Sequence, residues 1–368
     1  MTSVYNVHKG LSTDLIAATA DTIAAVQLPD GAIPWFPDGQ TDPWDHVEAA
    51  MGLDVAGRHE QARAAYAWLR ETQNPDGSWY RGYRGSGGTG SGRAALTVDD
   101  PVREANFTAY LAVGLLHHLH STGDARFVDQ MWPTLVAALD FTLALQQPGG
   151  EIRWARDPDG HVADEALLTG CASMFHSLRC ALALAAVREE PQPDWELAAT
   201  TLGHAVAAHP ERFSPRERYS MDWYYPVLGG ALRGEQAQAR IDAQWDTFVV
   251  PGLGIRCVSD RPWVTGAETC ELVLALAAIG DTKRAGALFA DMQHLRHEDG
   301  SYWTGFVYPD DAIWPQERTT WTAGVVLLAS AMLAGEPATT AVFGGADLPL
   351  SHDALQSGCD ACQDLSAA

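Results

Sequence analysis

The chain is short of positive charge. Its 368 residues include 24 Lys and Arg against 47 Asp and Glu, which gives a net charge of −23 and a pI near 4.7. Binding to a nucleic-acid backbone or to an anionic membrane surface needs a cationic footprint, so neither partner is expected. A hydrophobic share of 46% with 19% charged residues is typical of a folded globule rather than a disordered chain.

Long apolar runs and cysteines are also scarce. The apolar runs are interrupted by Gly, Arg or Glu well short of the ~18 residues of a membrane span, and no signal peptide is visible. Three of the six cysteines, Cys171, Cys180 and Cys270, fall in apolar helical patterns, as buried thiols do. The pair Cys359 and Cys362 would supply only half the ligands of a closed zinc site. We therefore expect a reduced, cytoplasmic protein with no metal or cofactor.

A repeated loop, in which a Gly turn precedes an aromatic residue, runs through the chain. Asp-Gly pairs favour turns because Gly adopts positive φ. Copies of the loop occupy residues 29–35, 73–79, 148–154 and 298–303, with a degenerate copy at 251–256. Repeats of this spacing indicate a fold built from similar units.

Two kinds of helix alternate with these loops. Amphipathic helices with one charged side, typical of an outer layer, are expected at 11–27, 60–72, 124–146, 194–209, 234–248 and 281–297. Helices that are apolar on nearly all faces, and therefore buried, begin near residues 42–45, 100–101, 164–165, 214–215, 265–268 and 318–320. This order predicts an all-α protein, an (α/α)6 toroid over residues 1–340 with a tail at 341–368 and strands only in short loop hairpins.

The loops and the first turns of the inner helices should share one face of such a toroid. Asp45 and Glu268 open the first and fifth inner helices there, and we predict that they are the catalytic pair of a glycosidase. Glu268 would be the general acid and Asp45 the base that activates water, although the roles could be reversed. Carboxyls facing each other across the axis would be ~6.5 to 9.5 Å apart, which implies inversion. The alternative is that both acids merely start helices, where negative charge is favoured.

The same face is rich in aromatic and polar side chains. Sugar rings stack on Trp and Tyr, while acids, amides, His and Arg bind the hydroxyls. Of the tryptophans, Trp35, Trp79, Trp303 and Trp314 are expected at the mouth of the pocket. The Gly-rich residues 85–92 are expected to form a flexible lid rather than a phosphate loop. The candidate substrate-binding residues are Trp35, Trp44, His46, Glu48, Trp79, Asn106, Asp222, Tyr224, Tyr225, Glu271, Trp303, Trp314, Arg318 and Trp321.

Residues 73–79 resemble the Gln/Trp repeat of squalene–hopene-type cyclases and prenyltransferase β-subunits, which are also α/α toroids. The cyclase signature is Asp-x-Asp-Asp, and the nearest stretch here, residues 97–100, begins with Thr. A terpenoid cyclase therefore stays an alternative, as does a toroid that binds carbohydrate without catalysis.

The whole chain is more similar to the six-hairpin glycoside hydrolases. Residues 42–51, 220–226, 265–272 and 314–321 together resemble the mycobacterial methylmannose polysaccharide hydrolases. This resemblance implies a cytoplasmic endo-α-mannosidase that acts on α-(1→4)-linked, 3-O-methylated mannan. The expected partner is thus an oligo- or polysaccharide, and the sequence does not indicate an oligomeric state.

Overall fold

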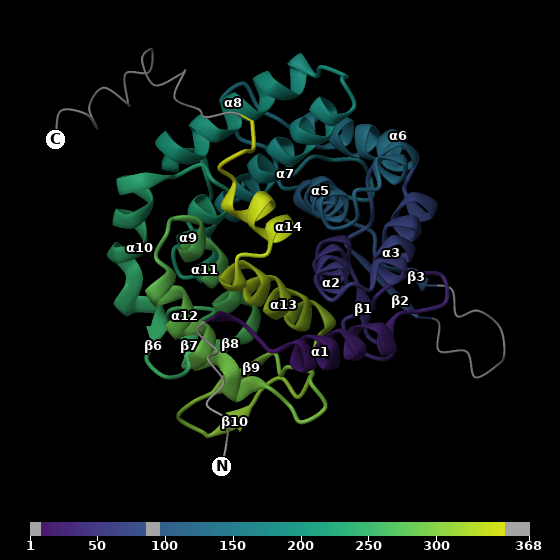
Figure 1. Cartoon of the computed structure of the whole chain (residues 1–368). Helices are drawn as coiled ribbons and strands as arrows, with labels where there is room; N and C mark the ends of the chain where they lie inside the picture. The colour runs from purple at the N-terminus through teal and green to yellow at the C-terminus, as the bar shows by residue number, and fades with distance from the viewer. Residues whose placement is uncertain (1–8, 86–95, 350–368) are drawn as a thin grey trace.

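Outer and inner helices alternate along the chain, as predicted, in a computed structural model that describes residues 9–85 and 96–349. The outer helices are α1 (Thr13–Val26), α3 (His59–Thr72), α6 (Ala125–Leu143), α8 (Pro193–Ala208), α10 (Gly234–Phe248) and α12 (Thr282–Asp291). The inner helices are α2 (Pro43–Val55), α4 (Ala105–Ala109) with α5 (Leu111–Thr122), α7 (Leu168–Val187), α9 (Ser220–Leu228), α11 (Gly266–Ala278) and α13 (Thr320–Ala334). Each inner helix contacts the next, and α13 returns to α2, so the ring of Figure 1 closes. The (α/α)6 toroid is confirmed.

The inner helices owe their position to their composition. By length and hydropathy, α7 could cross a membrane, and the bent pair formed by α13 and residues 337–344 passes the same test. Gly170 and Arg179 do interrupt the apolar run of α7, as expected, but the helix still passes a test based on length and mean hydropathy. Within α7, 78% of the apolar stretch is buried inside the ring. A helix that is apolar on all faces can be buried in the core of a toroid as well as in a membrane.

The repeated loop fastens each hairpin to the next outer helix. Nε2 of Gln73 donates 2.8 Å hydrogen bonds to the carbonyl oxygens of Gly77 and of Thr134 on α6. Gln27 and Gln146 occupy the same loop position and bridge to α3 and α8 in the same way. Gly77 has a φ of 89°, and a Cβ there would lie 2.0 Å from a backbone oxygen of α6. The repeat is therefore explained by ring assembly, since only Gly permits this approach.

The last loop closes the ring onto the first helix. Arg296 stands where the other loops carry Gln, and Thr19 of α1 takes over by donating a 2.9 Å hydrogen bond to the carbonyl oxygen of Gly300. Gly300, with a φ of 97°, lies directly against Ala18 of the same helix. The first and last hairpins are thus joined by contacts that no local sequence pattern encodes.

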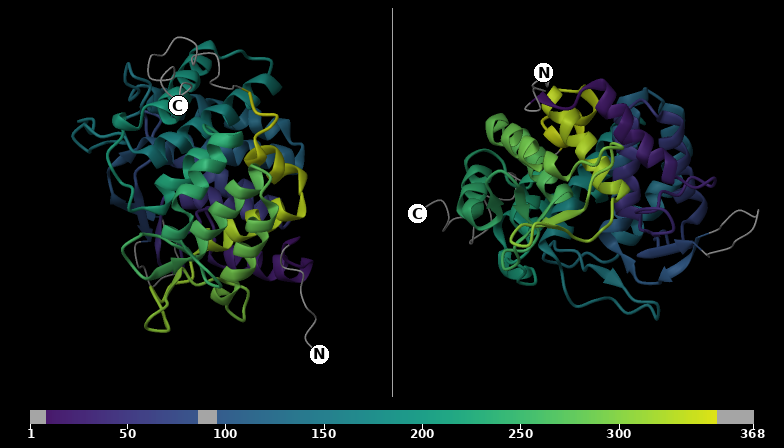
Figure 2. Two further views of the ribbon diagram at one scale, coloured as in Figure 1. Left: turned by 90° about the vertical axis from the view of Figure 1, so that its left-hand side faces the viewer. Right: turned by 90° about the horizontal axis from the view of Figure 1, so that it is seen from below.

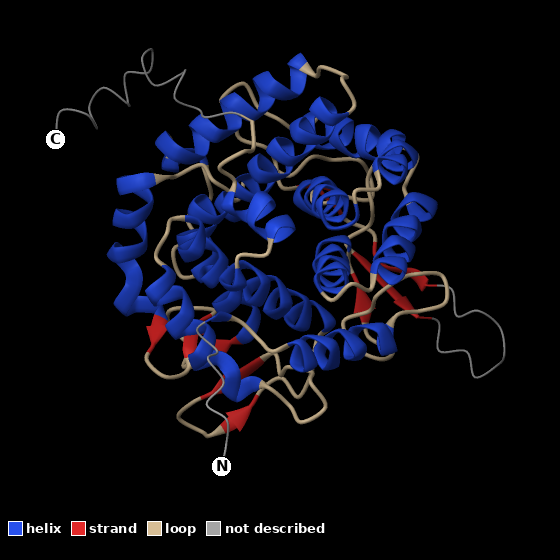
Figure 3. Ribbon diagram, viewed as in Figure 1, coloured by secondary structure: helices blue, strands red, loops and turns tan. Residues whose placement is uncertain are grey.

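Short strands gather at the loop-bearing end of the ring, and Figure 3 shows them outside the circle of helices. One antiparallel sheet joins β1 (Gln40–Thr41), β2 (Gly82–Gly85) and β3 (Leu96–Asp100), and a second pairs β4 (Arg103–Glu104) with β5 (Ala155–Arg156). A third, in the order β10-β9-β8-β7-β6, combines β6 (Val249–Val250), β7 (Gly254–Arg256), β8 (Trp263–Thr265), β9 (Gly305–Val307) and β10 (Ala312–Ile313). This five-stranded sheet is larger than the predicted loop hairpins, because β8 pairs with the distant β9. The core is mainly helical, although β7 contributes the fully buried Ile255 and β2 the buried Tyr83.

Inner helices two, three and four begin later than predicted. Asp42 does cap α2, since its Oδ1 accepts a 3.0 Å hydrogen bond from the backbone N of Asp45. The similar Asp100 does not cap a helix. It ends β3, and its Oδ2 accepts a 2.8 Å hydrogen bond from Nε of Arg81. An Asp-Pro pair is compatible both with a helix N-cap and with the end of a strand. Only the tertiary contact with Arg81 distinguishes Asp100 from Asp42.

The C-terminal segment covers the end of the ring opposite the strands, as the right-hand view of Figure 2 shows. It comprises α14 (Pro337–Thr339) and a π-helical turn (Thr340–Gly344). Nε2 of His117 lies 3.1 Å from Oγ1 of Thr339, and Nε2 of His176 lies 3.0 Å from the Val342 carbonyl oxygen. The predicted boundary at residue 340 falls within this packed segment. Cys359, Cys362 and residues 86–92 of the expected lid lie outside the described residues.

Candidate active site

Two inner helices bring four carboxyl groups to the axis of the ring. Asp45 and Glu48 lie three residues apart on α2, and Glu268 and Glu271 have the same spacing on α11. Side chains three residues apart share one face of a helix. Both helices flank α13 in the ring, and Asp45 and Glu268 lie one turn nearer the loop-bearing end. Two carboxyls at the mouth therefore stand above two that lie deeper.

The deeper pair is held by aromatic donors. Tyr224 and Tyr225 both donate hydroxyl hydrogen bonds to Glu271. Glu48 accepts a 2.9 Å bond from Nε1 of Trp44 and a 3.2 Å bond from the Tyr110 hydroxyl. Burial raises the pKa of Glu271 to about 8 despite the two tyrosine donors. Burial, and next the charge of Glu271, raise the pKa of Glu48 well above its usual range.

The mouth pair has fewer partners. Asp45 is only partly buried, and its pKa is raised well above the usual range, first by burial and then by the charges of Asp42 and Glu48. Glu268 is 8% exposed, and its Oε2 has no hydrogen-bond partner among the residues that the structure describes. The Cys257 thiol lies beside it, and burial, followed by the Glu268 charge, raises the pKa of that thiol. The mouth pair thus combines Asp45, which tends to keep its proton, with Glu268, which has one oxygen free of hydrogen bonds to the described residues.

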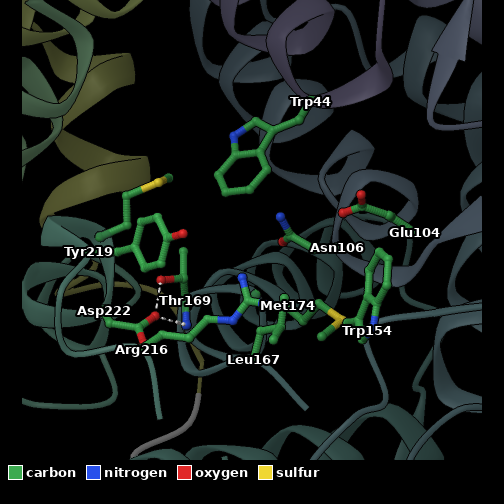
Figure 4. A pocket seen from close by; sticks show the side chains of 12 residues that line it. Trp44, Glu104, Asn106, Trp154, Leu167, Thr169, Met174, Arg216, Tyr219 and Asp222 are labelled. Atoms are coloured by element: carbon green, nitrogen blue, oxygen red, sulfur yellow. Dashed lines mark hydrogen bonds between the residues drawn. The ribbon is translucent and has the colours of Figure 1, made fainter. Parts of the chain in front are cut away.

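A cavity of about 190 Å³ adjoins this cluster. Trp44 is common to both, because its ring lines the cavity while its Nε1 binds Glu48. In Figure 4 this indole lies over the cavity from one side, and side chains of α7 lie on the other. The lining residues are Trp44, Glu104, Asn106, Trp154, Leu167, Thr169, Gly170, Met174, Arg216, Tyr219, Met221 and Asp222.

Three predicted substrate-binding residues therefore lie at the cavity, namely Trp44, Asn106 and Asp222. Asn106 is 5% exposed, and neither atom of its amide has a partner within the described residues. Asp222 is already engaged, since its Oδ1 accepts a 3.2 Å hydrogen bond from the backbone N of Thr169 and a second from the Thr169 hydroxyl. Burial raises the pKa of Asp222, although the Thr169 bonds oppose this.

Sequence reasoning missed most of the other lining residues. Leu167, Met174 and Met221 are apolar residues of helices or their ends, and in sequence they are indistinguishable from core positions. Arg216 and Thr169 belong to no motif. Arg216 and Thr169 both lie near the start of an inner helix, and this position could have identified them. The prediction missed it because inner helices three and four begin later than expected.

Two predicted substrate-binding residues are structural instead. His46 is 1% exposed; its Nδ1 accepts a 3.1 Å bond from the Ile33 backbone N, and its Nε2 lies 2.9 Å from the Ala65 carbonyl oxygen. Both ring nitrogens are thus occupied, and burial lowers its pKa to about 4. Trp79 is 1% exposed and donates a 2.9 Å bond to the Leu69 carbonyl of outer helix α3. The prediction that Trp79 lies at the pocket mouth was wrong.

The other four predicted tryptophans, Trp35, Trp303, Trp314 and Trp321, lie outside the lining of the first cavity. The rings of Trp35 and Trp321 are 6.3 Å apart, and Nε1 of Trp35 donates a 2.7 Å bond to Asp42. Arg318 lies 5.1 Å over the Trp303 ring and lines a second cavity of about 410 Å³. Trp314 is 55% exposed. None of these side chains lines the first cavity, so their contact with a saccharide stays a prediction.

The structure describes one group of side chains with metal-ligand spacing. Atoms of Asp157, Asp159 and His161 lie within 4.8 Å of one another, and Nδ1 of His161 already pairs with Asp157 at 3.1 Å. Exposed acidic groups of this kind are common without an ion, and this group does not line the first cavity.

Comparison with known proteins fits this geometry. No family model matches the chain. Over 339 residues it is 58% identical to the MMP endo-(1,4)-3-O-methyl-alpha-D-mannosidase of Mycolicibacterium hassiacum, a match that covers 92% of this chain and 91% of that protein. A glycosidase solved with glucose is 15% identical with a TM-score of 0.70, over 91% of this chain and 99% of that one.

Other solved structures share the fold at similar distance. A D-mannose isomerase has a TM-score of 0.65 at 11% identity, over 91% of this chain and 100% of that one. The mannosylglycerate hydrolase of Thermus thermophilus has a TM-score of 0.61 at 13% identity, over 85% and 99%. These likenesses show the fold alone, whereas 58% identity over nearly the whole chain decides the family. The chain belongs to the family of the M. hassiacum endo-mannosidase and is a glycoside hydrolase.

Proposed function

We propose that this chain is an endo-acting hydrolase of α-(1→4)-linked, 3-O-methylated mannan, which is the substrate named for its M. hassiacum relative. The observation that carries this proposal is the position of Asp45 and Glu268 in the first turns of α2 and α11, the two inner helices that flank α13. Glycoside hydrolysis needs two carboxyl groups, one to protonate the leaving oxygen and one to act on the anomeric carbon directly or through water. The adjoining aromatic cavity supplies the surface on which a sugar ring stacks.

The raised pKa of Asp45 favours the reverse of the roles first expected. A general acid must hold its proton at neutral pH, and the raised pKa of Asp45 suits that task. Glu268, with an oxygen that no described residue binds, suits the base that activates water. Both side chains lie in the first turn of an inner helix, where the helix dipole favours negative charge. Burial of Asp45, and next the charges of Asp42 and Glu48, outweigh that effect.

Two deeper carboxyls support this arrangement. Glu48 and Glu271 are held by indole and phenol donors, so they fix the walls around the mouth pair. Inversion is proposed because α2 and α11 are separated in the ring by α13. The two carboxyls would then approach the scissile bond from opposite sides with room for a water molecule.

The free thiols support a cytoplasmic location. Cys171, Cys180, Cys257 and Cys270 are unpaired, as is usual in a reducing compartment.

The test is direct. The protein is incubated with 3-O-methylated and unmethylated manno-oligosaccharides and with the gluco-oligosaccharides of equal length. Mass spectrometry should show internal cleavage of the methylated mannosides, and NMR of the first product should show the inverted anomer. Cleavage from one chain end, a retained anomer, or no cleavage of any mannoside would each contradict part of the proposal.

A further inference from the structure

The cavity beside the acid cluster is lined by both polar and apolar residues. Polar groups come from Glu104, Asn106, Arg216 and the Thr169–Asp222 pair. The apolar residues include Leu167, the N-cap residue of α7, and Gly170 and Met174 within this helix, whose spacing of three and four residues places them on one helix face. Met221 of α9 is a further apolar residue of the lining. We call Leu167, Gly170, Met174 and Met221 the apolar wall.

The volume limits what the cavity can hold. Pockets for drug-sized ligands usually measure ~300 to 1,000 Å³, whereas this cavity measures about 190 Å³. It therefore suits one sugar residue of a longer chain. The aromatic rings of Trp44, Trp154 and Tyr219 on its lining offer faces for that sugar ring.

Among the polar lining residues, Asn106 is suited to bind a hydroxyl group. Asn106 is nearly fully buried, and its amide oxygen and nitrogen lack partners among the described residues. A buried amide without hydrogen bonds is costly, so a ligand that supplies a donor and an acceptor is favoured there. A sugar hydroxyl is both a donor and an acceptor.

The apolar wall has the opposite preference. Its three side chains carry no hydrogen-bond donor, Gly170 has no side chain, and the methionines adapt their shape to small apolar groups. A sugar hydroxyl turned toward this wall would lose its water without gaining a partner. We propose that the apolar wall receives the O-methyl group of one sugar residue and thereby sets the preference for methylated mannan. This inference rests on the proposed function, because it assigns a specificity determinant of the same site.

Two substitutions change the wall without disturbing the fold. In Gly170→Ala the new Cβ would lie 3.7 Å from Cβ of Asn106 and 3.9 Å from Cβ of Leu167, both ordinary contacts. The added methyl thus occupies space between two lining residues. Leu167 is the N-cap residue of α7 and makes no side-chain cap, so Leu167→Asn introduces a favoured capping residue. The same change places a polar amide on the wall.

A matched control lies at the opposite end of the ring. In Gly344→Ala the new Cβ would lie 3.6 Å from Thr340 and 3.8 Å from Met332, again ordinary contacts. Gly344 does not line the cavity. This variant measures the effect of adding one methyl group to a partly buried glycine far from the cavity.

The experiment compares kcat/KM on 3-O-methylated and unmethylated manno-oligosaccharides of equal length. The wild type should prefer the methylated substrate by about 10- to 100-fold, which is the range for one small group in an apolar pocket. Gly170→Ala and Leu167→Asn should each reduce that preference by about tenfold, mainly by lowering kcat/KM on the methylated substrate. Gly344→Ala should keep the wild-type ratio.

Two outcomes would overturn the inference in distinguishable ways. If both wall variants keep the wild-type ratio while the methylated substrate is cleaved, the methyl group is read elsewhere and the proposed function stands. If the wild type cleaves no mannoside, the proposed function fails and the inference fails with it.

Discussion

The indole Nε1 of Trp44 donates a 2.9 Å hydrogen bond to Oε1 of Glu48. The same indole lines the cavity, so one side chain joins the sugar-sized space to the buried acids. Its ring also packs against Tyr110 and Tyr225, with centroids 5.4 and 5.7 Å away. Substrate bound on the indole would therefore contact a wall that is fixed by the acid cluster itself.

The mouth carboxyls should be indispensable for turnover. Asp45→Asn and Glu268→Gln should each lower kcat by about 100-fold or more, because each removes a proton transfer in the transition state. Binding of a non-hydrolysed oligosaccharide, measured by calorimetry, should change little. The exposed Asp38→Asn is the control and should keep wild-type turnover. Near-native kcat in either mouth variant would refute the assignment.

The roles of the two acids can be separated by the leaving group. An aryl mannoside with an acidic phenol needs no proton donor, so it should restore much of the kcat of Asp45→Asn. Glu268→Gln should remain slow on the same substrate, since water activation is still needed. The opposite pattern of rescue would assign the acid to Glu268.

Buried Glu271 should make stability fall as pH rises. Its pKa is raised from 4.5 to about 8, so the folded state holds this proton at pH values where the unfolded chain has lost it. The stabilising contribution is fully present below pH ~4.5 and is lost as the pH rises toward ~8. Glu271→Gln carries no titrating proton at this position, so its Tm should decline less between pH 5 and 8. Parallel Tm profiles of wild type and variant, measured by circular dichroism, would count against this account.

Two tryptophans should respond differently to the same substitution. Trp79→Phe loses the hydrogen bond to the Leu69 carbonyl, which should lower the free energy of unfolding by about 1–2 kcal/mol. Saccharide affinity of the folded protein should stay unchanged. Trp44→Phe loses the bond to Glu48 and part of the cavity surface, so it should weaken saccharide binding by about 1–2 kcal/mol. Urea unfolding would measure the loss of stability, and calorimetric titration the loss of saccharide affinity. Weakened binding in Trp79→Phe, or unchanged binding in Trp44→Phe, would contradict this prediction.

The repeated glutamines should matter for stability alone. Gln73→Ala removes two 2.8 Å hydrogen bonds, one to Gly77 within the loop and one to Thr134 of α6, and the unfolding free energy should fall by about 1–3 kcal/mol. The neighbouring Gln147 makes one side-chain bond, within its own loop, so Gln147→Ala should cost less. Equal losses of stability in the two variants would contradict the proposed role in joining hairpins.

The sequence by itself determined the alternation of outer and inner helices. The periodicity of apolar residues distinguishes an amphipathic outer helix such as α3 from an inner helix such as α13 that is apolar all round. The loop glycines and glutamines recur because each hairpin meets its neighbour in the same way. Asp45 and Glu268 could be placed at one face because both follow such loops and open inner helices.

Only the tertiary structure decided which side chains reach the cavity. His46 and Trp44 are two residues apart in one helix, yet one faces the outer layer and the other the cavity. In the same way, Trp79 was expected at the pocket but is buried against α3, whereas Met174 was not predicted and lines the cavity. A buried indole and a cavity-lining methionine fit the same apolar sequence pattern. The five-stranded sheet and the closure of Gly300 onto α1 depend on contacts between distant segments. Local periodicity sets which face of a helix is apolar, whereas the packing of all the hairpins sets whether that face meets protein or an open cavity.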